Sequence, residues 1–259
     1  MLGENLFAID KWARYSISTT AKGGKMKIDE MNEMLCFDFD TEFNRMCKEK
    51  ILTWFPWVGK NYCSAAKRIF MLWESHYADN VPDGEEDDEE FTRNVFYKNA
   101  ILGTIRNPAF ENALEILGIS TDRKDREKFF SNIACCNVIQ NIMPNSQKRP
   151  TPAQFQAGCR AFSKLRQILN PDVCIFWEVT VCNALHNFSD DHGDYGKVES
   201  CHDEKIGNCY PRYGKLQDGT KIAGVLHPAR CNNPSLRQEW RTWLFSAIPE
   251  LRSVIAKSR

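Results

Sequence analysis

Four short runs of apolar residues stand out along the chain, at residues 68–73, 128–133, 173–177 and 222–226. These runs are continuously apolar and lack the apolar-polar alternation of a half-exposed strand. Continuous runs of this kind are typical of parallel strands covered on both faces. Apolar residues recur at helical intervals over residues 90–102, 108–117, 151–169, 179–187, 235–245 and 249–257. This alternation predicts an α/β fold, a three-layer α/β/α sandwich with a central, mainly parallel four-stranded sheet.

The same pattern predicts the domain organisation. Residues 1–27, ending in AKGGK, are expected to form a weakly structured leader, and residues 28–259 a single domain. Within it, the helical periodicity of residues 29–52 ends before Pro56 and Gly59. Thr151 followed by Pro152 indicates a helix start. Residues 189–220 are polar and glycine-rich and predict an inserted loop, long or folded into a small hairpin.

Composition narrows the class of protein. With 42% hydrophobic residues the chain can build a packed core, but its longest apolar runs are too short to span a membrane. The first residues also lack the apolar core of a signal peptide. We therefore expect a cytoplasmic, monomeric protein with no membrane partner. The eleven cysteines are odd in number and include the adjacent pair Cys135 and Cys136, which favours reduced thiols.

Charge is balanced overall but unevenly placed. Residues 85–90 are six consecutive acids, which are typical of a solvated face or a loop. Residues 221–259 carry seven Lys and Arg against two Glu, and a polyanion would be expected there.

Polar residues follow the apolar runs, where a parallel sheet places its ligands beyond the carboxyl ends of the strands. The first run is followed by Glu74, Ser75, His76 and Tyr77, the third by Glu178, and the fourth by His227, Pro228 and Arg230, while Asn132 lies near the end of the second. We therefore expect these side chains to meet at one edge of the sheet.

In their order, these segments resemble the uracil-DNA glycosylase superfamily over roughly residues 66–245. The stretch FFSNIACC…KRPTPAQFQAGCRAFSKLRQILNPDVCIFWE is similar to the superfamily pattern N-V-V-K-C…N-R-x-P-T…C…L…P-x-V-I-x-x-G. GVLHPAR resembles its H-P-S motif, and WESHY resembles its first motif, G-Q-D-P-Y or G-E-x-P-G. The resemblance implies hydrolysis of the N-glycosidic bond of uracil or a related damaged or deaminated base in single- or double-stranded DNA, with the base flipped out of the stack.

The resemblance also implies roles for individual residues. Glu74, with Ser75, would position water and stabilise the sugar cation, and His227 would donate to the departing base. Asn132 would read the base edge and Tyr77 would lie against its C5 edge. His76 and Pro228 belong to the same motifs, and Arg230 would pair with a phosphate. The chain departs from the pattern at Trp73, where the family has glycine, and at Ser75, where its most active branch has Asp or Asn.

Other interpretations stay open. A protein of the same fold could bind a nucleobase or nucleic acid without catalysis. One branch of the superfamily carries an iron–sulfur cluster, and Cys136 and Cys159 fall near its last two ligands. The N-terminal C-x-x-C is missing, and Cys36, Cys47 or Cys63 could replace it only loosely, so no cofactor is expected. His192, Cys201, His202 and Cys209 lack the spacing of a standard zinc site and are expected to be solvated loop residues, with no metal bound.

Overall fold

The computed structural model describes residues 29–78, 87–104, 106–145, 147–187, 198–200 and 205–257. The expected leader at 1–27 lies outside these residues, as do the loop residues His192, Cys201 and His202. Within the described part, no helix is both long enough and apolar enough to cross a membrane.

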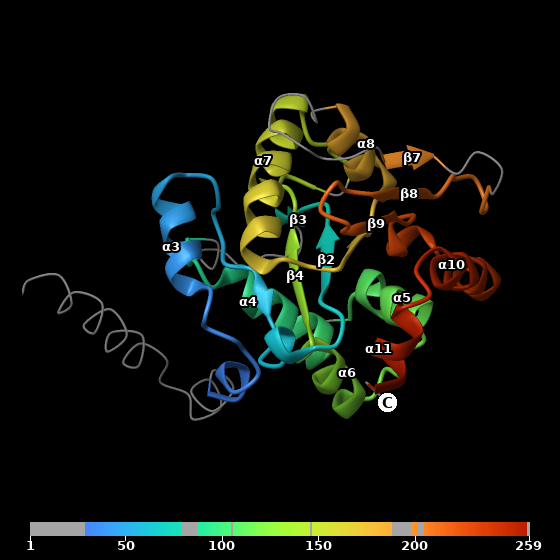
Figure 1. The fold of residues 1–259 in the computed structure, drawn as a ribbon, viewed down its shortest axis with the longest axis horizontal. Coiled ribbons are helices and arrows are strands. Elements are labelled where there is room, and N and C mark those ends of the chain that lie inside the picture. The colour runs from blue at the N-terminus through green and yellow to red at the C-terminus, as the bar shows by residue number, and fades with distance from the viewer. Residues whose placement is uncertain are drawn as a thin grey trace, which may run out of the picture.

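The described strands form a seven-stranded sheet in the order β1-β4-β2-β6-β9-β8-β7 (Figure 1). Its four central strands are parallel: β4 (Ile133–Asn137), β2 (Ile69–Trp73), β6 (Val173–Phe176) and β9 (Lys221–Gly224). Antiparallel strands extend both edges, β1 (Trp57–Val58) beside β4, then β8 (Arg212–Lys215) and β7 (Val198–Ser200) beyond β9. The parallel centre is confirmed, whereas the prediction of only four strands is wrong.

The prediction of the second strand is also wrong. Residues 128–133 contain the end of helix α6 (Arg123–Phe130) and the turn that precedes β4. Phe129 and Phe130 are buried from the last turn of this helix, so their hydrophobicity belongs to the helix face. The strand itself is the less apolar sequence IACCN, with all five residues buried.

The inserted segment is more than a loop. Its described residues include β7 and β8, which pair with each other and place β8 antiparallel to β9. A shorter pair of parallel strands, β3 (His76–Tyr77) and β5 (Ile142–Met143), lies outside the main sheet.

Helices follow the predicted segments closely, with one exception. The described helices are α3 (Asp40–Lys48), α4 (Phe91–Val95) continuing into the π-helical turn η3 (Phe96–Ile101), α5 (Pro108–Leu117), α6, α7 (Pro152–Leu169), α8 (Val179–Asn187), α10 (Pro234–Ala247) and α11 (Leu251–Lys257), with 3₁₀ turns η1 (Tyr62–Ser64) and η4 (Pro228–Arg230). The exception is the helix expected over residues 29–52, which is interrupted because Leu35 forms a β-bridge with Gly59.

Both faces of the sheet are covered by helices, which confirms the three-layer architecture. Side chains of β2 alternate between two cores, with Met71 and Trp73 in one and Phe70 and Leu72 in the other. The first core contains buried residues of η3, α5, α6, α10 and α11, and the second contains those of α3, α7 and α8.

The strand order creates a switch point between β2 and β6. From β2 the chain reaches β4 through η3, α5 and α6 on the first face, and from β6 it reaches β9 through α8 on the second. The connections from β2 and β6 thus run to opposite faces of the sheet. This leaves room beyond the carboxyl ends of the two strands, where open α/β sheets bind ligands. The residues after Trp73 and Phe176 therefore occupy the position at which a site is expected.

Candidate functional site

Five charged or titratable side chains gather beyond the carboxyl ends of β2, β6 and β9. We call this group the rim cluster: Glu74, Arg149, Glu178, His227 and Arg230. Arg149 Nη1 lies 3.2 Å from the Glu74 carboxylate, and the Glu178 carboxylate lies 3.9 Å from Arg149 and 3.7 Å from Arg230. Both carboxylates are buried, at 1% and 0% side-chain exposure, whereas Arg149 and Arg230 are 41% and 55% exposed. The two guanidinium groups therefore stand between buried acids and solvent.

The strand ends below the rim cluster hold several buried polar atoms without hydrogen-bond partners among the described residues. They are Trp73 Nε1, Glu74 Oε1 and Ser75 Oγ at the end of β2, and Trp177 Nε1 and Glu178 Oε2 at the end of β6. Leaving such an atom unsatisfied costs about 1–3 kcal/mol. The two indole rings are packed in the first core, Glu178 Oε2 is 3.7 Å from Arg230, and the Ser75 hydroxyl lies beside the Tyr77 phenol. Glu74 Oε1 is therefore the unpaired atom at the rim that a polar ligand or water would satisfy.

Glu74 combines burial with a partly free carboxylate. Burial raises its pKa, the positive charge of Arg149 lowers it, and the neighbouring Glu178 raises it again, with a net increase. Oε2 faces Arg149 and the Tyr77 hydroxyl, the latter 3.5 Å away, while Oε1 has no partner in the described residues. One oxygen is thus held in place and the other can face a ligand.

His227 is held as a neutral imidazole. Burial lowers its pKa to about 4, although the Glu178 charge acts in the opposite direction. Its Nδ1 accepts a hydrogen bond from the backbone N–H of Ala229 at 3.2 Å, so the ring proton is on Nε2. The turn that carries it, η4, is fixed to α5 because Asn112 donates to the carbonyl of Pro228 at 2.8 Å. Pro228 therefore contributes to the site as a buried backbone anchor.

His76 does not join the rim cluster, in contrast to its predicted role in binding substrate. Its Nε2 lies 3.0 Å from the Thr92 hydroxyl, and its ring packs against Trp54 and Phe91 with centroid distances of 5.3 and 4.7 Å. Burial lowers its pKa to about 3, so the ring is neutral in the interior. His76 is a packed core residue.

The predicted position of Asn132 is also wrong. β4 begins at Ile133, which is in register with Ile69, the first residue of β2. Asn132 is therefore at the amino end of the sheet, separated from Glu74 by about 20 Å, since six strand residues rise about 3.3 Å each. Its side-chain amide donates to the carbonyl of Lys128 at 2.6 Å and closes the end of α6. Asn137, which is 4% exposed and in register with Trp73, occupies the carboxyl end instead.

The remaining residues of the first motif differ in where their side chains lie. The ring of Trp73 points into the first core, where it packs against Phe96 and Phe110 at centroid distances of 5.1 and 5.4 Å. The large indole ring of Trp73 is therefore accommodated in the core. Tyr77 is half-buried, and the Ser75 hydroxyl lies beside its phenol.

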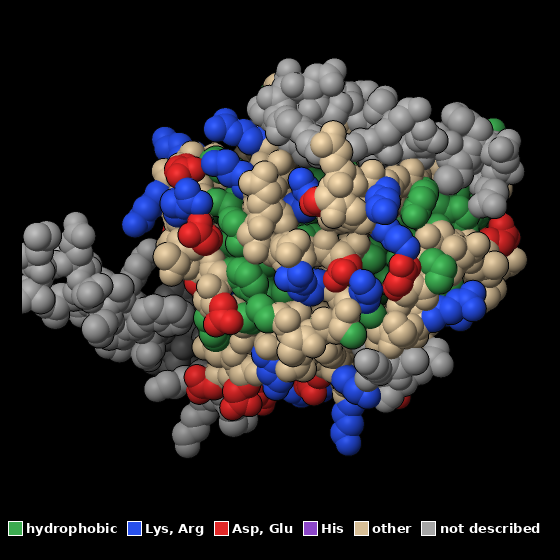
Figure 2. All heavy atoms as spheres, in the orientation of Figure 1, with side chains coloured by type: hydrophobic (Ala, Val, Ile, Leu, Met, Phe, Trp, Pro, Cys, Tyr) green, Lys and Arg blue, Asp and Glu red, His purple; other side chains and the backbone are tan. Residues whose placement is uncertain are grey.

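The basic excess near the C-terminus is largely engaged within the fold. Lys221 pairs with Glu250, and Arg237 pairs with Glu115 at 2.8 Å. Arg241 donates to the backbone carbonyl of Ile116 at 3.3 Å. Arg230 is the member of this group that joins the rim cluster, and Figure 2 shows basic and acidic side chains interspersed across one face of the molecule.

The acidic run is only partly a solvated face. Its first two residues lie outside the described part of the chain, but Glu90 is paired at 3.0 Å with Arg93, whose side chain is fully buried. Asp88 accepts from the backbone N–H of Glu90 at 2.9 Å and leads into α4.

The cysteines give no iron–sulfur arrangement in the described residues. Cys136 and Cys159 are buried in the second core and belong to no group of three close metal-ligating side chains there. Ten of the eleven cysteines lie in the described part of the chain, and no disulfide joins any of these ten.

Sequence reasoning missed two residues at this end of the strands, Arg149 and Asn137, and gave no role to a third, Glu178. Arg149 lies between β5 and α7 and follows no strand directly, so no local pattern marks it. Asn137 was hidden by the wrong position of the second strand. Glu178 follows the third apolar run and carried a signal, but no motif of the resemblance assigned it a role.

Comparison with known proteins adds no family to this picture. No protein-family model matches the chain, and no curated protein sequence matches it.

Proposed function

We propose that the chain binds a nucleobase of DNA at the rim cluster and hydrolyses its N-glycosidic bond. The observation that carries the proposal is that a buried carboxylate, Glu74, and a neutral imidazole, His227, have the same three charged neighbours, Arg149, Arg230 and Glu178. The resemblance of the sequence to the uracil-DNA glycosylase superfamily supports the same reaction.

The chemistry requires two groups of opposite character. As the bond between C1′ and the base nitrogen breaks, its electrons move to the base and the sugar becomes an oxocarbenium ion. His227 Nε2–H would donate to the base oxygen on which negative charge develops. The ionised Glu74 would stabilise the cation and accept a proton from the water that bonds to C1′.

Base recognition would come from the end of β4. We assign this role to Asn137, because it stands beside Trp73 at the carboxyl edge, where Asn132 does not. Its amide offers both a donor and an acceptor to a base edge. Tyr77 and Ser75, next to Glu74 in the chain, would line the same side.

One observation favours a second function. The 3.2 Å contact between Arg149 and Glu74 already compensates the carboxylate that catalysis would use. A protein that binds a base without cleaving it is therefore the second candidate.

Cleavage can be tested directly. The protein is incubated with single- and double-stranded oligonucleotides that contain uracil, hypoxanthine, xanthine or hydroxymethyluracil, and alkali-labile abasic sites are counted. We expect Glu74→Gln and His227→Gln each to lower the cleavage rate by about 100-fold or more, since single catalytic groups contribute on that order. Glu239→Gln, at an exposed carboxylate on α10, is the matched control and should cleave normally.

Each other outcome has a definite meaning. Binding of a modified oligonucleotide without abasic product selects the non-catalytic binder. Neither binding nor product with any of these bases rules out both candidates. Unchanged cleavage in Glu74→Gln removes the proposed mechanism even if the activity is present.

A further inference from the structure

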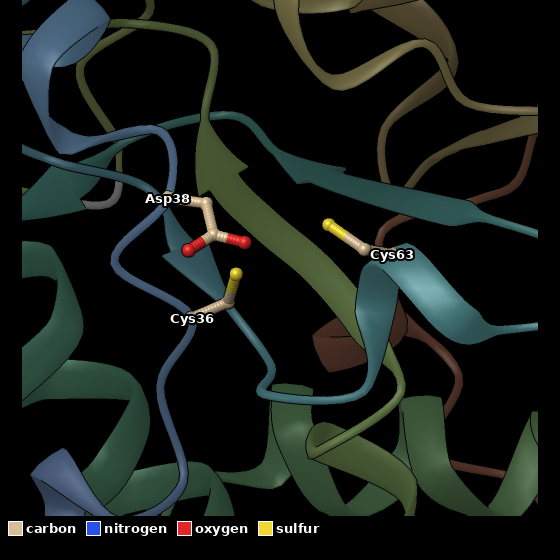
Figure 3. A group of neighbouring side chains, drawn as sticks. All are labelled: Cys36, Asp38 and Cys63. Atoms are coloured by element: carbon tan, nitrogen blue, oxygen red, sulfur yellow. The ribbon is translucent and has the colours of Figure 1, made fainter.

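Three potential metal ligands from two separate segments converge at a place distinct from the rim cluster. Cys36, Asp38 and Cys63 point toward one another in Figure 3, and one ligand atom of each lies within 4.8 Å of the other two. Cys36 is buried, whereas Asp38 and Cys63 are exposed. Among the residues that the structure describes, this is the one group of three or more His, Cys, Asp or Glu side chains with such proximity.

Backbone hydrogen bonds fix the first segment against the second. The N–H of Cys36 donates to the carbonyl of Val58 at 2.8 Å, and the N–H of Lys60 donates to the carbonyl of Met34 at 2.8 Å. Gly59 lies between these bonds and must be glycine, because a Cβ atom there would be 2.2 Å from the carbonyl oxygen of Phe130. The position of Cys36 is thus set by the sheet edge.

Cys63 is directed by its own anchor. It lies in the 3₁₀ turn η1 next to Tyr62, a fully buried residue whose hydroxyl donates to the carbonyl of Leu169 at 3.3 Å. The N–H of Tyr62 donates to the carbonyl of Gly59 at 2.9 Å. The turn therefore projects Cys63 toward Cys36 and Asp38 independently of those two residues. Gly59 lies beside Ile133 at the amino end of β4. Cys36, Asp38 and Cys63 are therefore near the amino ends of the central strands, whereas the rim cluster is at their carboxyl ends.

We propose that Cys36, Asp38 and Cys63 bind a zinc ion. Two sulfur ligands and one carboxylate suit Zn²⁺, whereas Mg²⁺ and Ca²⁺ take oxygen ligands. Tetrahedral zinc with bonds of about 2.0–2.3 Å places its ligand atoms about 3.5–3.8 Å apart, so a closure of about 1 Å forms the site. The exposed Asp38 and Cys63 side chains can move by this amount. A fourth position is left for water.

Charge supports a cation at this place. Within the described residues Asp38 forms no ion pair, and the three groups that meet here are all acids. A divalent cation allows the three groups to be ionised together, with release of the thiol protons on binding.

Zinc here would hold two segments together. Residues 36–38 and residue 63 belong to chain segments that also meet through a short β-bridge, a few backbone hydrogen bonds and the edge contact of the Phe39 and Tyr62 rings, whose centroids are 6.3 Å apart. Because zinc would bind the folded chain and not the unfolded one, it should raise the melting temperature.

The test uses the full chain, reduced and freed of metal with a chelator. Zinc is added in competition with a chromophoric chelator, and cobalt is added separately to record the near-ultraviolet band of thiolate-to-cobalt charge transfer. We expect one equivalent of zinc, a cobalt–thiolate band, and a rise in melting temperature with zinc. Cys63→Ser and Asp38→Asn, both at exposed positions, should each weaken zinc binding at least tenfold and reduce the rise in melting temperature.

Cys47→Ser is the control, because the Cys47 thiol lies on α3 and faces the carbonyl of Thr53 at 3.9 Å, outside the group. It should bind zinc as the parent chain does. Absence of zinc and cobalt binding, or equal binding by Cys63→Ser, would overturn the proposal. Mild oxidation that removes two thiols from the parent chain, without any metal binding, would identify Cys36 and Cys63 as a disulfide-forming pair instead.

Discussion

Arg149 balances the charge of the rim cluster although it follows no strand. It contacts Glu74 at 3.2 Å, and its guanidinium donates to the Thr180 hydroxyl at 3.0 Å at the start of α8. Its positive charge lowers the pKa of both Glu74 and His227. One half-exposed side chain therefore acts on the carboxylate and on the imidazole together.

Replacing Arg149 should change the ionisation of Glu74 in a definite direction. Arg149→Met removes the largest influence that lowers this pKa, so we expect the Glu74 pKa to rise above its already raised value. Carbon-13 NMR titration of the carboxyl group measures it. Arg230→Met is the control, because Arg230 acts on Glu74 in the same direction with a smaller effect, and it should produce a smaller rise.

The raised pKa of Glu74 should also make the free energy of unfolding of Arg149→Met depend on pH. A carboxyl group with a raised pKa in the folded state contributes stability below its unfolded pKa, and this contribution is lost as the pH rises through the folded pKa. The free energy of unfolding of Arg149→Met should therefore fall further below that of the parent chain as pH increases. A difference that is constant with pH would contradict the link between Arg149 and Glu74.

Helix α7 positions the segment that supplies Arg149. Its start is set locally, because the Thr151 hydroxyl accepts from the N–H of Gln154 and the Gln154 side chain accepts from the N–H of Thr151. Its distance from the sheet is set at Gly158, where a Cβ atom would lie 2.7 Å from the carbonyl oxygen of Val138. The capping pattern is legible in the sequence, whereas the close approach depends on which strand the helix packs against.

Adding one methyl group at this contact should disturb the fold. We expect Gly158→Ala to lower the free energy of unfolding by about 1–3 kcal/mol, since overpacking in a close contact typically costs this much despite the better helix propensity of alanine. Urea denaturation measures the loss. Ala157→Ser, an equally small addition at the exposed neighbouring position, should change stability by less than about 1 kcal/mol. Equal stability of Gly158→Ala and the parent chain would show that α7 can move away.

The carboxyl and amino ends of the central strands differ in how their charged side chains are paired. The carboxyl ends of the central strands carry the rim cluster, with the unpaired oxygen Glu74 Oε1, whereas paired charges around Asp172 lie at the amino ends. The Asp172 carboxylate accepts from the N–H of Arg68 at 2.8 Å and from Lys67 Nζ at 2.9 Å, and its own carbonyl accepts from the N–H of Lys221 at 2.9 Å. One residue thus joins the starts of β2, β6 and β9.

This contrast makes a prediction for acid stability. Burial raises the pKa of Asp172, but the hydrogen bonds from Arg68 and Lys67 outweigh it and the pKa is lowered. Its stabilising contribution is therefore present above the unfolded pKa and is lost as the pH falls through the folded pKa. We expect Asp172→Asn to cost about 1 kcal/mol at pH 7 and the difference to close below about pH 4. Urea denaturation at several pH values tests this, with Glu239→Gln as an exposed control.

Much of the architecture could be predicted because its causes are local. The apolar runs at β2, β6 and β9 and the helical periodicity of α5, α7, α8 and α10 are properties of neighbouring residues, and alternation of such segments indicates a parallel sheet between helices. From this alone, Glu74 and His227 were expected at one edge, and the structure brings their surroundings together. The prediction of the second strand was wrong because Phe129 and Phe130, which lie in a helix, are more apolar than the strand residues Ala134 and Cys135.

The amino-acid sequence by itself determined the strands β2, β6 and β9 and most of the helices, and hence that Glu74, Glu178 and His227 follow strand ends. Only the tertiary structure decided which strands are neighbours, that the switch point falls between β2 and β6, and that Arg149 reaches Glu74. The tertiary structure also distinguished two histidines that each follow a strand. His76 packs into the core, whereas His227 belongs to the rim cluster. The physical reason is that strand order and side-chain direction result from packing between segments distant in the chain, where no local pattern records the partner.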